Sequence, residues 1–376
     1  MRGKKLHAAL VVLRGTRRRR DAWAGWRCRW ARTGWKPGLL GCVWLLACAA
    51  GCRGPLQAVT QSRVTMHNSA VEDRGPLLEK EVIADRGCPQ GKIAIVDVDG
   101  LLVNSSLAGL GSVGENPVSL FREKLDAVAS DPCYRAVVVR INSPGGGVTA
   151  SDIMGHDLRA FREQTRLPVV ACLMDVAAGG AYYLATAADH IVAHPTTVTG
   201  GMGVILNLYN LQDTMAYFNV TAVPVKAGQY ADLGSPVEPM GEEARAILQG
   251  VADEFHARFE AAVRTGRPQH DPSRKEDFDG RVFTASQALQ RRLVDSIGYL
   301  DDAVDVAREL GQCPSAGVVL LRRANDPARS PYATTPNSTM QSGLFPMSIP
   351  GLDRSQLPTF LYLWQPEPTY ERRTAR

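Results

Sequence analysis

The stretch Ala136-Val-Val-Val-Arg-Ile-Asn-Ser-Pro-Gly-Gly-Gly-Val148 decides the fold of this chain. Its first six residues form a β-branched apolar run without alternation, which is typical of a strand covered on both faces in a mostly parallel sheet. The three glycines that follow permit backbone angles that side chains forbid. Apolar residues at helical spacing come next, at Ile153, Leu158 and Phe161. Strand, glycine turn and helix in this order predict an α/β architecture.

The same pattern extends on both sides of this stretch. Residues 93–98 and 168–173 are further short apolar runs that predict strands, and a helical pattern precedes residue 130. The clearest helix is expected from about Gly241 to Arg264, where an apolar stripe runs from Ala244 to Phe259. No internal repeat is visible, so we expect a single layered domain.

The charge of the chain is concentrated at its N-terminus. The 376 residues carry a net charge of +5, but residues 1–37 contain 12 Lys or Arg and one Asp, which leaves the remainder acidic. Basicity confined to one end does not indicate a nucleic-acid-binding protein. An uncharged run from Pro37 to Gly51 follows, shorter than the roughly 20 residues of a spanning helix and typical of a signal peptide.

This apolar run ends in small residues and cysteines. Ala-Ala-Gly precedes Cys52, and Leu-Leu-Ala precedes Cys48. Both resemble a bacterial lipobox, in which the cysteine is acylated and becomes the mature N-terminus. Cys52 is the first choice and Cys48 the second, while a plain secretory signal or an uncleaved anchor remains the alternative. We therefore expect an exported protein, associated with the membrane of a bacterial cell envelope through this leader.

Several motifs in the chain carry a resemblance to a known family. Asn142–Val148 reads Asn-Ser-Pro-Gly-Gly-Gly-Val, residues 174–189 contain Ala-Ala-Gly-Gly-Ala-Tyr-Tyr, residues 197–204 read Thr-Val-Thr-Gly-Gly-Met-Gly-Val, and residues 226–236 read Lys-Ala-Gly-Gln-Tyr-Ala-Asp-Leu-Gly-Ser-Pro. With residues 279–298 they resemble peptidase family S49, the signal peptide peptidase type. The resemblance implies a ClpP/crotonase-like layered fold, an oligomeric assembly and peptide hydrolysis by a Ser nucleophile with a Lys general base.

The resemblance also assigns site positions, and three of them hold inert residues. Gly179 stands at the nucleophile, Ala231 at the general base, and Gly201 at the Ser that orients the Lys. Ser–Lys chemistry needs a hydroxyl, an unprotonated amine and an orienting group, and all three are missing. By the same resemblance, Gly145 and Gly146 would supply the N–H groups of an oxyanion hole.

Three functions compete on this basis. The first is a catalytically inactive S49 homologue that binds peptides or acts as a scaffold. The second is an active serine endopeptidase that degrades signal peptides or membrane-associated peptides, supported by the retained glycine loop. The third is acyl-thioester chemistry on the shared fold, for which no other sign exists. Lys226 lies five residues from Ala231 but would find no Ser to activate, and His190 and His194 are expected to be structural.

The expected partners follow from the first function. They are extended peptide segments, the membrane through the leader, and further copies of the chain or an active paralogue. We expect no cofactor and no metal, because the scattered cysteines lack zinc spacing and no His-Glu-x-x-His occurs.

The expected organisation has four parts: a leader at 1–52, a polar linker at 53–90, the S49-like domain at 91–312, and a Pro-rich tail at 313–376. One apolar patch in that tail, Leu357–Trp364, must be docked on the body, on a partner or near the membrane.

Overall fold

The computed structural model describes residues 75–84, 91–106, 108–109, 112–113, 115–323, 328–333 and 360–364. The chain divides into two compact units, residues 1–65 and 66–376, and all the described residues lie in the second. Cys48 and Cys52 lie outside the described residues, so the expected leader and lipidation stay predictions.

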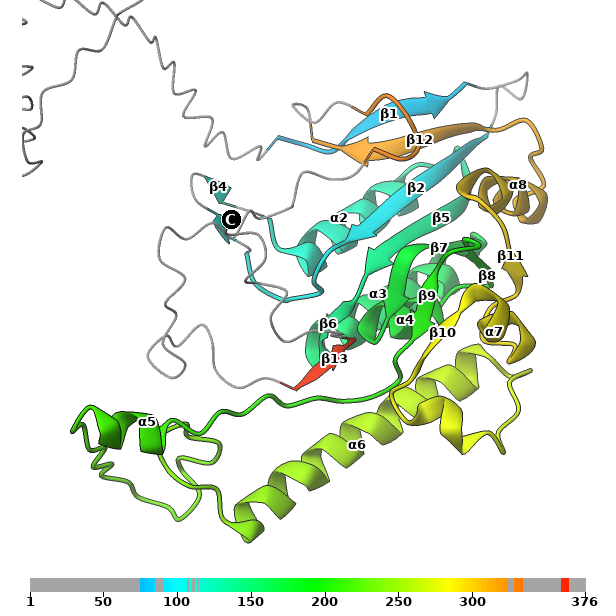
Figure 1. Ribbon diagram of the computed structural model, residues 1–376. Coiled ribbons are helices and arrows are strands. Elements are labelled where there is room, and N and C mark those ends of the chain that lie inside the picture. The colour runs from blue at the N-terminus through cyan, green and yellow to red at the C-terminus, as the bar shows by residue number, and fades with distance from the viewer. Residues whose placement is uncertain are drawn as a thin grey trace, which may run out of the picture. The chain divides into compact units, whose positions relative to one another are not determined.

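A nine-stranded, mostly parallel sheet forms the centre of this unit, as predicted (Figure 1). Along its main path the strands are β1 (Leu78–Ile83), β12 (Gly317–Arg322), β2 (Lys92–Asp99), β5 (Tyr134–Ser143), β7 (Val169–Ala178), β8 (His190–Ala193) and β11 (Ser296–Ile297). β9 (Val198–Gly200) pairs with β7, and β10 (Val282–Thr284) pairs with β9. Only the β1–β12 and β9–β10 pairings in this sheet are antiparallel. The predicted strands at 93–98, 136–141 and 168–173 are thus confirmed as β2, β5 and β7.

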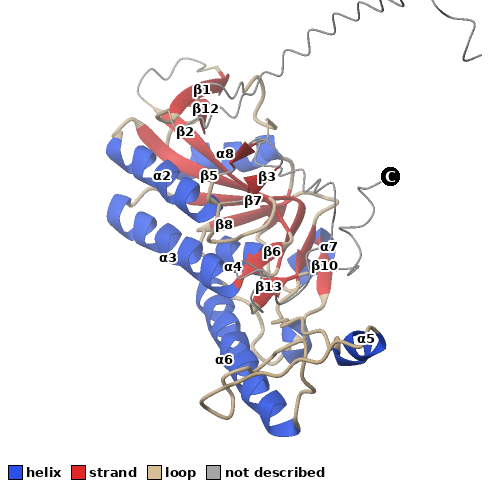
Figure 2. Cartoon of the chain, turned by 90° about the vertical axis from the view of Figure 1, so that its left-hand side faces the viewer, coloured by secondary structure: helices blue, strands red, loops and turns tan. Residues whose placement is uncertain are grey.

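Helices cover both faces of the sheet (Figure 2). α2 (Pro117–Ser130), α3 (Val148–Thr165) and α4 (Gly180–Ala185) pack on one face, and α8 (Leu300–Leu310) packs on the other. Alternate residues of β5 enter the two cores: Val137 and Val139 face the first, whereas Ala136 and Val138 face the second. This two-sided burial explains the continuous apolar runs in the sequence.

Local sequence explains where the first helix begins. Pro117 opens α2, where its fixed φ suits the helix and its missing N–H costs nothing. Asn116 caps the helix, since its Oδ1 accepts a hydrogen bond from Val118 N at 3.0 Å.

Two sheet strands lie outside the domain range expected from sequence. β1 lies within the expected linker and β12 within the expected tail, yet β12 sits in the sheet between β1 and β2. β1 is an edge strand with only partial burial, so its Leu-Glu-Lys-Glu-Val-Ile sequence resembles a polar linker. β12 is fully buried, but its apolar run stands beside the Pro-rich composition of the tail.

A long segment leaves the sheet after β9. We call residues 204–254 the arm; it holds α5 (Gln212–Tyr217) and the first half of α6 (Glu242–Gly266). No residue from 203 to 258 is buried, whereas Phe259 and Val263 further along α6 are. The predicted helix from Gly241 to Arg264 is confirmed as α6. Only the C-terminal part of its apolar side is packed on the body.

The remaining short elements complete the unit. They are β3 (Ala108–Gly109), β4 (Ser112–Val113), β6 (Gly145–Gly147), η1 (Lys275–Phe278), α7 (Ala285–Gln290) and β13 (Leu361–Leu363). β13 comes from the tail and pairs with β6, although more than 200 residues separate them in the sequence. Among the helices that the structure describes, none has the length and apolarity needed to cross a bilayer.

Candidate functional site

Four glycines predicted to line the site gather where β5, β7 and β9 end. Gly179 forms the N-cap of α4 with φ 56° and ψ −126°, and its N–H donates to Gly200 O at 2.9 Å. A Cβ placed on Gly201 would lie 3.3 Å from Gly179 N, and one on Gly145 would lie 2.7 Å from Gly180 N. In open α/β sheets, ligands bind at this carboxyl end of the strands. The structure therefore brings Gly145, Gly146, Gly179 and Gly201 together.

The two predicted oxyanion donors, Gly145 and Gly146, have different hydrogen-bond partners. Gly145 N–H donates to Ser143 Oγ at 3.1 Å. Gly146 lies opposite Tyr362 in the β6–β13 ladder. The flanking bonds run from Val148 N to Phe360 O and from Trp364 N to Pro144 O. Gly146 and Tyr362 lie midway between these bonds, so they form a pair that exchanges backbone hydrogen bonds.

The tail segment Phe360–Trp364 is bound in this site as an extended strand. On one edge it pairs with β6, and on the other Leu361 exchanges hydrogen bonds of 2.9 and 3.0 Å with Ile205. We call the space between β6 and Ile205 the groove. Such two-edged pairing is the way extended peptides are held by backbone groups. Residues 360–364 of the apolar tail patch thus lie on the body of the same chain.

The peptide bond between Tyr362 and Leu363 lies directly over Gly179. A Cβ placed on Gly179 would lie 2.7 Å from the carbonyl carbon of Tyr362 and 3.0 Å from Leu363 N, and closer still to Tyr362 O. A nucleophilic side chain at residue 179 would thus face this carbonyl group. Glycine itself has no side-chain atom that could attack this carbonyl group.

An aromatic pocket receives the side chain of Tyr362. Its ring is fully buried, stacks on Tyr183 at a centroid distance of 5.6 Å, and packs on Phe259 at 4.7 Å. Its hydroxyl donates to Phe255 O at 2.6 Å. Burial raises the pKa of Tyr362, so the hydroxyl stays a donor. Phe360 makes an edge-on contact with Phe255 at 5.2 Å, so two tail rings are held by α4 and α6.

Asp152 of α3 supports the pocket from behind. Its Oδ1 accepts a hydrogen bond from Tyr183 Oη at 2.6 Å, and Arg258 of α6 donates to both carboxylate oxygens. Burial opposes ionisation of Asp152, but the bonds from Arg258 and Tyr183 outweigh it and hold its pKa below the ordinary value. Asp152 therefore stays charged and fixes the ring that Tyr362 stacks on.

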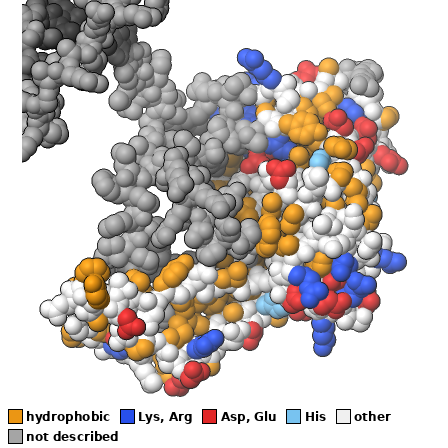
Figure 3. All heavy atoms as spheres, viewed as in Figure 1, with side chains coloured by type: hydrophobic (Ala, Val, Ile, Leu, Met, Phe, Trp, Pro, Cys, Tyr) orange, Lys and Arg blue, Asp and Glu red, His pale blue; other side chains and the backbone are white. Residues whose placement is uncertain are grey.

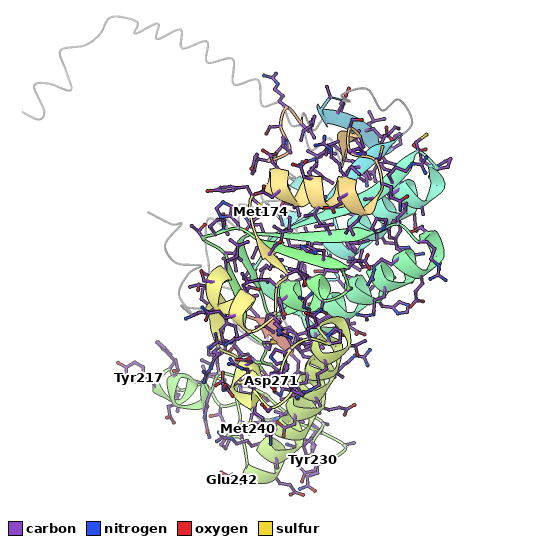
Figure 4. All side chains as sticks on the ribbon, turned by 90° about the vertical axis from the view of Figure 1, so that its right-hand side faces the viewer. Met174, Tyr217, Tyr230, Met240, Glu242 and Asp271 are labelled. Carbon is purple, nitrogen blue, oxygen red and sulfur yellow. The ribbon has the colours of Figure 1, made fainter. Side chains whose placement is uncertain are left out.

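The predicted base position lies elsewhere. Ala231 follows Tyr230, which lies near the N-terminal end of α6, where Figure 4 labels Glu242. A hydrogen bond to Glu243 raises the pKa of Tyr230. Helix α6 rises about 18 Å between Glu243 and Phe255 at the pocket. Within one chain, Ala231 is therefore not part of the groove.

Lys226 and the serines near the groove are each engaged with other groups. Lys226 lies in the arm and donates to Asp232 at 2.5 Å and to Glu238 at 3.2 Å, which raises its pKa and keeps it protonated. Ser143 Oγ accepts from Gly145, and Ser151 Oγ donates to Gly147 O at 2.9 Å. Each group has a structural partner of its own.

The described residues also place the other candidates of the sequence analysis. His190 contacts Ser296 Oγ at 3.0 Å and His194 contacts Thr196 Oγ1 at 2.8 Å, as side chains that fix local structure. Within the described ranges, no group of three or more His, Cys, Asp or Glu is arranged to hold a metal ion.

Sequence reasoning missed the pocket residues Tyr183, Phe255 and Phe259, as well as the second edge at Ile205. Two signals pointed toward them. Tyr183 lies in the nucleophile motif, and both phenylalanines lie on the apolar stripe of α6.

A parallel sheet with a glycine-lined groove that holds an extended strand is an arrangement suited to binding a peptide. Residues 161–313 match peptidase family S49. The predicted resemblance to S49 serine peptidases of the signal peptide peptidase type is thereby confirmed.

Three relatives make the similarity specific. The chain is 28% identical over 239 residues to the putative signal peptide peptidase SppA of Enterococcus faecium, covering 64% of this chain and 69% of that protein. It is 32% identical over 209 residues to the chloroplastic serine protease SPPA of Arabidopsis thaliana, covering 55% and 31%. It is 31% identical over 229 residues to Protease 4 of Salmonella typhi, covering 61% and 36%. The chain thus spans about two thirds of the first relative and about one third of the other two.

Proposed function

We propose that this protein is a non-catalytic S49 homologue that binds extended peptides and does not cleave them. The observation that carries the proposal is Gly179, which lies under a bound peptide bond and offers no nucleophile. The groove itself needs only backbone groups of β6 and Ile205, and these do not depend on a catalytic side chain.

The competing function is an active serine endopeptidase. Its support is the retained glycine loop. In serine proteases without their triad residues, the oxyanion hole and substrate binding still accelerate hydrolysis roughly 10³–10⁴-fold over the reaction in water. Against it stand the positions of Ser143 and Ser151, whose hydroxyls are engaged with the backbone. Lys226 is held protonated by two carboxylates in the arm.

The arm supports an oligomeric assembly as part of this proposal. It exposes large apolar side chains, among them Tyr217 at 86%, Phe218 at 70% and Val225 at 100%. Figure 3 shows hydrophobic side chains gathered toward the end of the arm. Exposed apolar clusters of this kind mark interaction sites. The partner we propose is a second copy of the chain or an active paralogue.

We further propose export and membrane anchoring through Cys52, or Cys48 as the second choice. The support is the basic leader followed by an apolar run that ends in Ala-Ala-Gly-Cys. Fatty-acid labelling that persists in a Cys48→Ala, Cys52→Ala double variant would exclude lipidation at these residues.

The activity test compares the full chain with one restored at all three positions. Wild type should neither cleave a denatured protein nor react with a serine-directed phosphonate. The restored chain carries Gly179→Ser, Gly201→Ser and Ala231→Lys and serves as the reactive counterpart. Cleavage by wild type that is lost in Ser143→Ala or Lys226→Ala would establish the endopeptidase function instead.

A further inference from the structure

We propose that Phe360–Trp364 is a built-in occupant that closes the groove, and that Gly179 is the residue that admits it. The ligand class for this groove is then an extended apolar peptide with an aromatic residue opposite Gly146, which binds by displacing the tail. This inference rests on the proposed function, since it treats the groove as a binding site and not as a hydrolytic one.

The backbone of the tail fits the groove along its whole described length. Phe360, Leu361 and Trp364 each make backbone hydrogen bonds to the body, at distances between 2.9 and 3.2 Å. Leu361, Tyr362 and Leu363 stand in register with the three glycines of β6. A strand bonded on both edges has the geometry of a bound substrate and not of a loosely packed terminus.

At Gly179 the closest contacts come from the tail alone, whereas a Cβ on Gly145 would meet both the tail and the body. The three atoms nearest to a Cβ on Gly179 are Tyr362 O, Tyr362 C and Leu363 N, all from the tail backbone and none farther than 3.0 Å. Backbone atoms held by hydrogen bonds on both edges cannot rotate away as a side chain would. Any residue larger than glycine therefore excludes the tail in its present position. Glycine at residue 179 therefore has two effects: it removes the attacking group, and it leaves room for the tail.

The aromatic pocket determines which side chain the bound strand needs at its central position. Tyr362 fills the space between Tyr183 and Phe259, and its hydroxyl reaches Phe255 O. Trp364 lies over Gly201, where a Cβ would stand 3.4 Å from the Trp364 Cβ. A tyrosine side chain at the central position both buries apolar area and donates a hydrogen bond to this carbonyl. A competing peptide needs the same feature.

Hydrogen–deuterium exchange on the full chain tests the role of Gly179. In wild type, the amides of Leu361 and Trp364 should be protected together with those of β5 and β7. In Gly179→Ala, tail protection should be lost while β5 and β7 stay protected. Gly250→Ala is the matched control, because a Cβ on this helical glycine meets nothing within 4 Å. Unchanged tail protection in Gly179→Ala overturns the proposal.

A second variant acts from the tail, in case Gly179→Ala unfolds β7. Tyr362→Pro in the full chain removes the N–H that pairs with Gly146. A labelled peptide with the sequence of residues 357–367 should then bind to Tyr362→Pro about tenfold more tightly than to wild type. The same peptide with Ala at position 362 should bind to Tyr362→Pro about tenfold more weakly than the unchanged peptide does. Tyr370→Pro in the tail is the control and should bind like wild type. Equal binding by wild type and Tyr362→Pro, or equal binding of the two peptides, overturns the proposal.

The proposed non-catalytic function is tested by a different measurement. Mass analysis of the labelled peptide after incubation shows whether it was cleaved, independently of how tightly it bound. A cleaved peptide counts against the non-catalytic function, whereas binding that ignores the tail counts against the occupant.

Discussion

Asp152 is the residue whose charge holds the aromatic pocket in place. It joins α3 to Tyr183 of α4 and to Arg258 of α6 through short hydrogen bonds. We expect Asp152→Asn to lower the free energy of unfolding by about 1 kcal/mol, because a charged hydrogen bond to Tyr183 is weakened and Arg258 is largely in solvent. Urea unfolding at pH 7 measures this. Asp126→Asn removes an exposed ion pair with Arg122 and should cost less than about 0.5 kcal/mol.

The Asp152 contribution should also depend on pH. Its pKa in the folded state is below the ordinary value, so its stabilisation is fully present above the unfolded pKa of about 3.9 and is lost as the pH falls through the folded pKa. The stability difference between wild type and Asp152→Asn should therefore shrink below about pH 4. A difference that stays constant down to pH 2 would show that the carboxylate charge is not the cause.

Lys124 is a buried charge on the apolar face of α2. Its Nζ lies 2.6 Å from Asp97 Oδ1, and both side chains are at most 2% exposed. Lys124→Met should destabilise the fold by about 3 kcal/mol, because Asp97 loses its nearest partner while Arg322 at 3.6 Å and Arg140 at 3.8 Å compensate only in part. Lys92 is partly exposed and also forms ion pairs. Lys92→Met should lower the free energy of unfolding by no more than about 1 kcal/mol in the same denaturation.

At the scale of elements, apolar runs predicted strands only where both faces are covered. β2, β5 and β7 were predicted from their runs because two cores bury them. β1 was missed because it is an edge strand with three charged residues in a row, and β12 because it enters the sheet between β1 and β2 from beyond the expected domain end. Strand order depends on contacts distant in sequence, so periodicity alone does not reveal it.

The site was predictable to the extent that it lies in continuous motifs. Gly145, Gly146, Gly179 and Gly201 follow the S49 pattern in sequence and lie together in the structure. The pocket depends on α6 crossing α4 and on the tail returning from far along the chain. Neither arrangement has a local signature, so the occupant of the groove became visible only in the structure.

Helix α6 has two parts with different energetic roles. Phe259 is fully buried against Tyr183 and Tyr362, whereas Ile247 on the same stripe is 39% exposed. Phe259→Ala should lower the free energy of unfolding by about 3–5 kcal/mol, since it leaves a cavity in the core and under the tail. Ile247→Ala should cost about 0.5 kcal/mol or less in the same denaturation. Similar losses for both would mean that the first half of α6 is packed against a surface of the same molecule.

At the scale of the whole molecule, the arm has no core of its own. About fifty consecutive residues contain none that is buried, although many are apolar. We expect Phe218→Gln with Val225→Gln to shift the protein toward a monomer in sedimentation while its melting temperature changes little. Leu310→Gln on α8, which is 44% exposed, is the control and should leave the assembly intact. A wild-type chain that sediments as a stable monomer at micromolar concentration would remove the assembly proposal.

The position of Ala231 in the arm makes a last prediction about how a site could be rebuilt. About 18 Å of helix separates the neighbourhood of Ala231 from the pocket, so a lysine placed there cannot serve Gly179 of its own chain. If the arm docks on another copy, that lysine reaches the groove of the neighbour. Two inactive chains, one with Gly179→Ser and Gly201→Ser and the other with Ala231→Lys, should therefore gain peptide hydrolysis only when mixed. The first chain needs no further change to open its groove, because a side chain at residue 179 already excludes the tail. Activity in the mixture that disappears with Phe218→Gln and Val225→Gln on the lysine chain would tie the catalytic geometry to the arm. Equal activity in a single chain that carries all three restored residues at high dilution would instead show that the arm folds back onto its own groove.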